Sequence, residues 1–128
     1  MGARQPPGPT VVVVDDDRDT LDVLALGLSR CGAVVSTYAD AEHAVAALQW
    51  TSPDAVLTDL TLSPRDGFWL MAQVRANPRL AHLPIVVLTG HGESAYLEAA
   101  RRSGADDVLI KPVDTRVIYN RILRLIPS

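Results

Sequence analysis

Four short apolar runs in this sequence each lead directly to side chains that could bind a metal ion or a phosphoryl group. These side chains are the acids Asp15, Asp16, Asp17 and Asp59, the hydroxyl of Thr89 and the ammonium of Lys111. Parallel strands flanked by helices end at one edge of a sheet, where open α/β sheets bind their ligands. We therefore predict that acid, hydroxyl and ammonium groups meet around Asp59.

Strands and helices are expected to alternate strictly along the chain. The expected strands are residues 10–14, 33–37, 55–58, 85–88 and 107–110. The expected helices are residues 18–31, 41–50, 67–76, 93–102 and a last one that carries the stripe Ile118, Ile122 and Leu125. The β-branched run 11–14 lacks polar alternation, which is typical of a strand covered on both faces. The alternation predicts an α/β fold, with a parallel sheet and helices on both faces.

Length and composition indicate one globular domain. The chain has 128 residues, of which 48% are hydrophobic and 21% charged. We expect residues 1–9, with three prolines and two glycines, to form a flexible leader, 10–126 to form the domain and 127–128 to form a short tail. A net charge of −3 gives no electrostatic footprint for nucleic acid, whose binders usually show a basic face, so direct binding is not expected.

Cysteine content and hydropathy indicate the compartment. Cys31 is the single cysteine, which excludes an intrachain disulfide. No apolar stretch approaches the roughly 18 residues of a membrane span, and the leader lacks the apolar run of a signal peptide. These features favour a cytoplasmic protein that does not enter a membrane.

The three consecutive acids cannot all point into one site, because side chains alternate along an extended chain. Acids are favoured at helix N-termini, so we expect one of the three to cap the first helix and two to face Asp59. Carboxylates about 4 Å apart repel by about 4 kcal/mol at an effective dielectric of 20. A cation must compensate, and both Mg²⁺, which prefers oxygen ligands, and the point charge of Lys111 are suited to that role.

Asp59, Thr89 and Lys111 have complementary chemistry for phosphoryl transfer: a nucleophile, a hydroxyl donor and a group that neutralises charge. Carboxylates form aspartyl phosphates in covalent catalysis, and phosphoryl transfer depends on positioning and electrostatics. Taken singly, each residue has an ordinary explanation. Thr89 alone is typical of a turn, and Lys111 alone is typical of a solvated surface.

Four motifs together resemble the receiver domain of two-component response regulators. They are VVVDD at 12–16, VLTD at 56–59, VVLTG at 86–90 and GADDVLIKP at 104–112. The resemblance covers residues 10–126, and four motifs in the right order make it specific. It implies a doubly wound, flavodoxin-like fold with five parallel strands in the order 2-1-3-4-5 and five helices, similar to that of chemotaxis regulators.

The resemblance also implies a role for each candidate residue. Asp59 would accept a phosphoryl group from a sensor histidine kinase, and Thr89 and Lys111 would contact its oxygens. Asp15, Asp16, Asp59 and the backbone carbonyl of Thr61 would bind Mg²⁺. The chain would then be a phosphoacceptor with slow self-dephosphorylation rather than an enzyme. The resemblance further implies a cis Lys111–Pro112 bond.

Three positions depart from the family pattern. The family usually carries an aromatic ring three residues before the lysine, where this chain has Val108, so output through a swinging ring is not expected. The proline usual four residues after the phosphoacceptor is replaced by Ser63, with Pro64 one position later, so the loop there is expected to differ. His91, two residues after Thr89, is expected to modulate the lifetime of the phosphoryl group.

Partner surfaces follow from the same resemblance. Val23 and Leu26 lie outside the buried stripe of the first helix, where kinases of this system dock, so we expect them to contact the kinase. Tyr119 and Leu123 on the last helix are candidates for an output surface or a homodimer contact. No effector is present in the sequence, so the chain is either a stand-alone regulator or the receiver of a longer protein that acts through an effector domain or a downstream protein.

Two other functions share features with this sequence. A hydrolase of the haloacid dehalogenase type also has an acid-tipped first strand, but it needs Thr or Val four residues after its nucleophile. Asp19 follows Asp15 at that distance, and there is no cap domain. A receiver-like interaction module that works without phosphorylation fits Val108 and the altered loop, but the complete set of acid, threonine and lysine argues against it.

Overall fold

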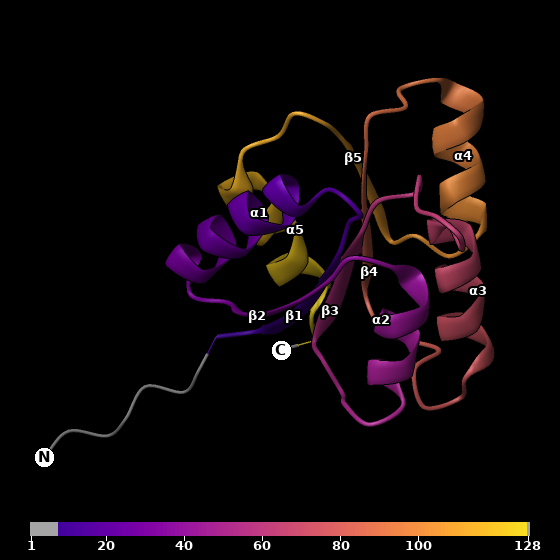
Figure 1. The fold of residues 1–128 in the computed structure, drawn as a ribbon, viewed down its shortest axis with the longest axis horizontal. Coiled ribbons are helices and arrows are strands. Elements are labelled where there is room, and N and C mark those ends of the chain that lie inside the picture. The colour runs from indigo at the N-terminus through magenta and orange to yellow at the C-terminus, as the bar shows by residue number, and fades with distance from the viewer. Residues whose placement is uncertain (1–7, 128) are drawn as a thin grey trace, which may run out of the picture.

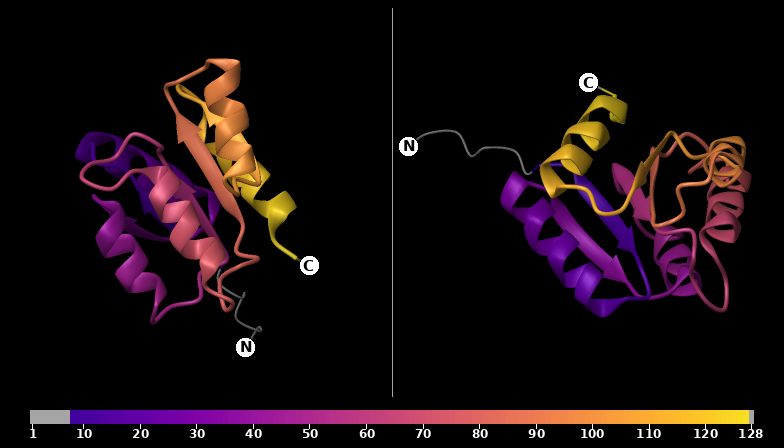
Figure 2. Two further views of the ribbon diagram at one scale, coloured as in Figure 1. Left: turned by 90° about the vertical axis from the view of Figure 1, so that its right-hand side faces the viewer. Right: turned by 90° about the horizontal axis from the view of Figure 1, so that it is seen from above.

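The computed structural model describes residues 8–127 and shows a parallel sheet between two layers of helices (Figures 1 and 2). The strands are β1 (Thr10–Val14), β2 (Val34–Tyr38), β3 (Ala55–Thr58), β4 (Ile85–Thr89) and β5 (Asp107–Ile110). The helices are α1 (Arg18–Cys31), α2 (Ala41–Leu48), α3 (Gly67–Ala76), α4 (Ser94–Arg102) and α5 (Thr115–Leu125). The five strands lie in the order β2-β1-β3-β4-β5, which confirms the predicted fold and strand order.

The helices divide between the two faces of the sheet, as Figure 1 shows, with α1 and α5 on one side and α2, α3 and α4 on the other. Successive residues of β1 contact opposite layers. Val11 and Val13 pack with α1 and α5, while Val12 and Val14 pack with α2, α3 and α4. Each face of the strand is therefore buried, which explains the apolar run without polar alternation.

The register of the strands brings the ends of β1, β3, β4 and β5 to one edge of the sheet. Val14 lies opposite Thr58, so the residues that follow, Asp15 and Asp59, leave the sheet side by side. The amide of Asp59 donates to the carbonyl of Val14 at 3.1 Å, and the amide of Lys111 donates to the carbonyl of Thr89 at 2.8 Å. These bonds extend the pairing one residue past the strands and fix where the candidate side chains begin.

The second strand begins at Val34, one residue later than expected. Gly32 ends α1 in the left-handed conformation, with φ of 117°, which glycine adopts without steric cost. The amide of Ala33 then donates to the carbonyl of Leu28 at 3.0 Å, so Ala33 still belongs to the helix cap. The expected range 33–37 is therefore wrong by one residue at each end.

Three other element ends differ from expectation. Helix α2 ends at Leu48 rather than at residue 50, because the amides of Gln49 and Trp50 bond to carbonyls three residues back in a tighter turn. Strand β4 includes Thr89. Helix α4 begins at Ser94, with Glu93 as an N-cap whose side chain makes no capping hydrogen bond.

Arg75 connects α3 to the loops that precede β4 and β5, at the edge of the sheet opposite the candidate site. Its guanidinium donates to the carbonyls of Ala81 at 3.0 Å, Leu83 at 2.6 Å and Gly104 at 2.6 Å, and to the carboxylate of Asp106 at 2.9 Å. Asp106 also accepts the amide of Ile85 at 2.8 Å. This network gives Asp106, the first acid of the GADD motif, a structural role at the starts of β4 and β5.

Most of the expected leader lies outside the described residues, and so does Ser128. Within the described part, the carbonyl of Pro9 accepts the amide of Val34 at 2.9 Å. Over residues 8–127, no helix is both long enough and apolar enough to span a membrane.

Candidate functional site

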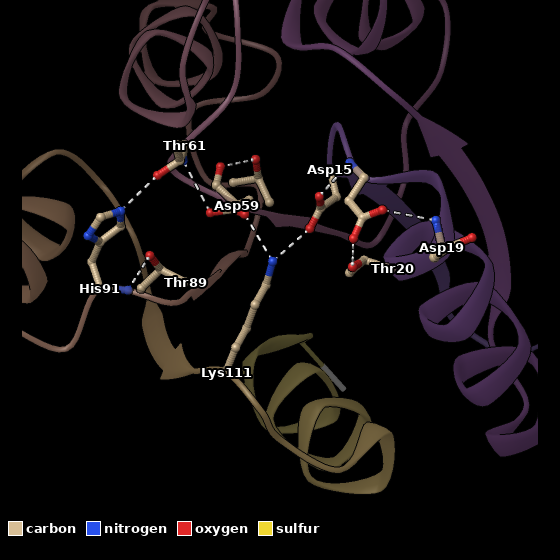
Figure 3. A network of polar contacts seen from close by, with 10 residues as sticks. Asp15, Asp19, Thr20, Asp59, Thr61, Thr89, His91 and Lys111 are labelled. Atoms are coloured by element: carbon tan, nitrogen blue, oxygen red, sulfur yellow. Dashed lines mark hydrogen bonds and ion pairs between the residues drawn. The ribbon is translucent and has the colours of Figure 1, made fainter.

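Two acids and one lysine form the centre of the site, as Figure 3 shows. The ammonium nitrogen of Lys111 lies 2.9 Å from Oδ2 of Asp15 and 2.9 Å from Oδ2 of Asp59. The side chains of Asp15, Asp59 and Lys111 are 3%, 12% and 29% exposed. Two acids in so dry a position would repel each other strongly, and the shared ammonium offsets that repulsion.

The charge of Lys111 is maintained by these two acids. Burial alone would lower the pKa of the Lys111 ammonium, but the hydrogen bonds and negative charges of Asp15 and Asp59 outweigh it and raise the pKa above its ordinary value. Lys111 is therefore a fixed cation at neutral pH, placed beside both carboxylates.

The three consecutive acids have separate surroundings. Asp17 caps α1, accepting the amide of Asp19 at 3.2 Å and the hydroxyl of Thr20 at 2.8 Å. Asp15 is turned into the site, and its second oxygen accepts the amide of Asp17 at 2.9 Å. Asp16 is exposed. The expectation that one of the three caps the first helix is met by Asp17.

The backbone around Asp59 orients its carboxylate. Oδ1 of Asp59 accepts the amide of Thr61 at 3.1 Å, which leaves Oδ2 for Lys111. Helix α3 begins close against this turn, since a Cβ on Gly67 would lie 2.3 Å from the carbonyl oxygen of Asp59. Glycine at that position lets the helix begin directly behind the carboxylate.

Thr89 and His91 line the neighbouring strand end. The buried hydroxyl oxygen of Thr89 accepts the amide of His91 at 3.1 Å. The imidazole Nε2 of His91 lies 3.1 Å from Oγ1 of Thr61, which joins the loop after β4 to the loop after β3. The sequence pattern predicts a role for the carbonyl of Thr61 but not this contact of its side chain with His91. The spacing in the sequence could have indicated this contact. Thr61 lies two positions after Asp59, and His91 lies two positions after Thr89.

The donors at this edge suit a hard cation. Asp15 and Asp59 offer carboxylate oxygens, and the exposed Asp16 is adjacent to Asp15 in the chain. Over residues 8–127, no three His, Cys, Asp or Glu side chains gather into a metal-binding cluster. A cation here would need backbone carbonyl and water ligands besides the acids, which is how Mg²⁺ commonly binds proteins.

The positions that depart from the family pattern are also located. Val108 is buried in β5, in the apolar cluster shared with α3 and α4. The Lys111–Pro112 bond is cis, as predicted. The Ser63–Pro64 bond is also cis, which is not predicted from the sequence.

An apolar hollow lies next to Lys111 on the side of α1. It has a volume of about 300 Å³ and is lined by Asp19, Thr20, Val23, Leu24, Leu88, Lys111, Pro112 and Val113. Val23 and Leu26 of α1 are 65% and 54% exposed. On α5, Tyr119 is half-buried and Leu123 is exposed.

Comparison with known proteins gives the family. The sequence profile described as the response regulator receiver domain matches residues 11–123. A 14.6 kDa protein of Leptolyngbya boryana is 38% identical over 81% of this chain and 79% of its own length. The transcriptional regulatory protein AfsQ1 of Streptomyces coelicolor is 34% identical over 89% of this chain, which spans about half (49%) of that protein.

A solved structure shares the fold. It is the receiver domain of the sensor histidine kinase PA1611 from Pseudomonas aeruginosa, with a magnesium ion coordinated in the active site cleft. The two structures superpose with a TM-score of 0.87 at 27% sequence identity. The match covers 94% of this chain and 99% of the PA1611 chain. The profile match, the relatives and the edge formed by Asp15, Asp59 and Lys111 lead to one conclusion: the chain belongs to the family of response regulator receiver domains of two-component systems.

Proposed function

We propose that Asp59 accepts a phosphoryl group from a sensor histidine kinase and that this modification switches an output surface. The observation that carries the proposal is the ammonium of Lys111, held 2.9 Å from Asp59 and 2.9 Å from the buried Asp15. A carboxylate beside a fixed cation at the open edge of the sheet is suited to receive a dianionic group.

Residues of this chain supply the groups that accept and stabilise the transferred phosphoryl group. A carboxylate oxygen of Asp59 attacks phosphorus, the bond from phosphorus to the kinase histidine breaks, and the imidazole leaves with the bonding electron pair. Lys111 neutralises the charge on the phosphoryl oxygens, and the Thr89 hydroxyl, whose oxygen accepts the His91 amide, donates its proton to one of them. The product is an aspartyl phosphate, which water hydrolyses slowly.

We also assign Mg²⁺ to this site, bound by Asp15, Asp16, Asp59 and the backbone carbonyl of Thr61. When bound, the ion supplies positive charge to the phosphoryl oxygens. The donor set supports this assignment, because the available donors are oxygens, which Mg²⁺ prefers. The magnesium ion in the receiver domain of PA1611 is independent support.

The proposed kinase contact is the exposed part of α1. Val23 lines the hollow that reaches Lys111, and Leu26 is exposed on the same helix, so a kinase helix seated there would bring its histidine to the edge of the site. Tyr119 and Leu123 of α5 are the proposed contact with an effector domain, a downstream protein or a second copy of the chain. A cytoplasmic location belongs to the same proposal, since the one thiol, Cys31, forms no disulfide.

An interaction module that works without phosphorylation is the second candidate. Val108 favours it, because this buried aliphatic side chain cannot swing as a ring does when Thr89 moves. The two candidates differ in whether Asp59 is modified.

Intact mass after incubation with acetyl phosphate distinguishes them. We expect a gain of one phosphoryl group that needs Mg²⁺ and is lost in Asp59→Ala. An unchanged mass with and without Mg²⁺ would overturn the phosphoacceptor proposal in favour of the second candidate. Asp66→Ala, which removes only the N-cap of α3, is a matched control that should still be phosphorylated.

A further inference from the structure

His91 lies on a loop whose backbone does little to hold its side chain. Gly90 and Gly92 flank it, and glycine allows the backbone its widest range of conformations. The helix that follows, α4, has no side-chain cap at its start and fully buries only Ala100. The position of the imidazole therefore depends on the contacts of its own ring.

Three side chains contact that ring from different directions. Nε2 of His91 lies 3.1 Å from Oγ1 of Thr61, and Nδ1 lies 4.0 Å from a carboxylate oxygen of Glu93. The ring of Tyr96 lies against the imidazole face, with centroids 4.6 Å apart and planes inclined by 39°. Thr61 and Glu93 thus meet the ring nitrogens, while Tyr96 limits its tilt.

Tyr96 is better anchored than Glu93. Its ring meets Phe68 of α3 edge to face, with centroids 5.7 Å apart and planes at 83°, a geometry that aromatic pairs prefer. Both rings pack against the buried cluster that contains Val108. The side chain of Glu93 is 73% exposed, and ion pairs between exposed groups contribute little. Tyr96 is therefore the contact that can hold the imidazole on Thr61.

We propose that Tyr96 is a positioning residue for phosphoryl retention, acting by holding the imidazole of His91 on Thr61 at the mouth of the site. The inference rests on the proposed phosphoacceptor function of Asp59. Loss of the phosphoryl group requires a water oxygen to attack phosphorus while the bond to the Asp59 oxygen breaks. The carboxylate is regenerated, inorganic phosphate leaves with the water oxygen, and a proton goes to solvent. An imidazole held on Thr61 narrows the approach of that water.

The proposal gives α4 a direct connection to the site. Tyr96 belongs to α4 and Phe68 to α3, so a partner that shifts α4 moves the ring that holds His91. By linkage, a phosphoryl group that changes the loop at His91 changes the affinity of α4 for such a partner.

The first test measures the half-life of the phosphorylated protein by intact mass after acetyl phosphate is removed. Tyr96→Leu should shorten it about threefold, a change of modest free energy, while Tyr96→Phe, which keeps the ring, should match the wild type. Leu97→Ala is the matched control, since Leu97 is a half-buried neighbour on the same helix in the same cluster. It should lower thermal stability without changing the half-life.

The same measurement in a His91→Ala background shows whether Tyr96 acts through His91. Tyr96→Leu should then have no further effect, because residues that act through one contact are not additive. An unchanged half-life in Tyr96→Leu, or an equal shortening with His91 present and absent, would overturn the proposal.

The second test needs no phosphorylation. The imidazole protons of His91, identified in NMR spectra by their loss in His91→Ala, should show a ring-current shift that persists in Tyr96→Phe and disappears in Tyr96→Leu. Unchanged imidazole shifts in Tyr96→Leu would contradict the positioning role. If the wild-type chain is not phosphorylated, the proposed phosphoacceptor function is wrong. The imidazole shifts would still show whether Tyr96 holds His91.

Discussion

The ammonium nitrogen of Lys111 lies 2.9 Å from a carboxylate oxygen of Asp59, although the two residues are 52 positions apart in the chain. They follow β5 and β3, which are separated in the sheet by β4. The side chain of Lys111 is extended, and its ammonium points toward Asp59 and Asp15 (Figure 3). The contact thus depends on three strand ends lying at one edge, and it underlies the predictions on charge and phosphoryl chemistry.

Lys111 should give the stability of the fold a pH dependence in alkali. Burial lowers the pKa of this ammonium, but Asp15 and Asp59 raise it by more, to above its ordinary value of 10.5. When folding raises the pKa of a group, the charged group stabilises the folded protein. This stabilisation is complete at pH values below the pKa of the group in the unfolded chain. It is lost as the pH rises through the pKa of the group in the folded protein. We expect the free energy of unfolding to fall above about pH 10.5, and to fall less steeply in Lys111→Met. Urea denaturation at several alkaline pH values measures both slopes, and equal slopes would contradict the assignment.

His91→Ala should shorten the lifetime of the phosphoryl group. The imidazole lies 3.1 Å from Thr61 Oγ1 at the mouth of the site, and a methyl group would leave that approach open to water. We expect roughly three- to tenfold faster loss, equivalent to about 1 kcal/mol in the barrier. Timed mass spectra after removal of acetyl phosphate measure the rate. His82→Ala, which changes an exposed histidine outside the site, is the control, and an unchanged rate in His91→Ala would refute the role of His91.

Leu26→Glu should slow transfer from the cognate kinase without affecting transfer from acetyl phosphate. Leu26 is 54% exposed on α1, and a buried, unpaired carboxylate in the kinase contact would slow transfer several-fold. Leu123→Glu is a matched change at a leucine that is 44% exposed on α5, and it should leave kinase transfer normal. Normal transfer to Leu26→Glu from both donors would show that α1 is not the docking surface.

Arg75→Met should destabilise the fold and leave the site intact. The guanidinium donates to three backbone carbonyls and to Asp106, and the substitution leaves these acceptors without their donor. We expect a loss of about 2–4 kcal/mol in the free energy of unfolding, measured by urea denaturation. Arg101→Met, at an exposed position of α4, should change stability by less than about 0.5 kcal/mol. A similar small change in Arg75→Met would mean that the network contributes little.

Local sequence signals predicted most of the fold. Apolar runs, helix caps and breakers are properties of neighbouring residues, so the ten elements and their order could be read directly. The ends that were wrong lie where backbone geometry decides, as at Ala33, whose amide completes the cap of α1 instead of starting β2. The same limit applies to Gln49 and Trp50, which continue α2 as a tighter turn.

The sequence by itself determined which side chains stand at the strand ends, because the order of the residues places each of them directly after an apolar run. It did not determine which distant side chains these residues contact. That Asp15 faces Lys111, that His91 meets Thr61, and that Arg75 reaches Asp106 was decided by the tertiary structure alone. Each of these contacts joins residues 30 or more positions apart, and such contacts depend on the register of the assembled sheet rather than on local preference.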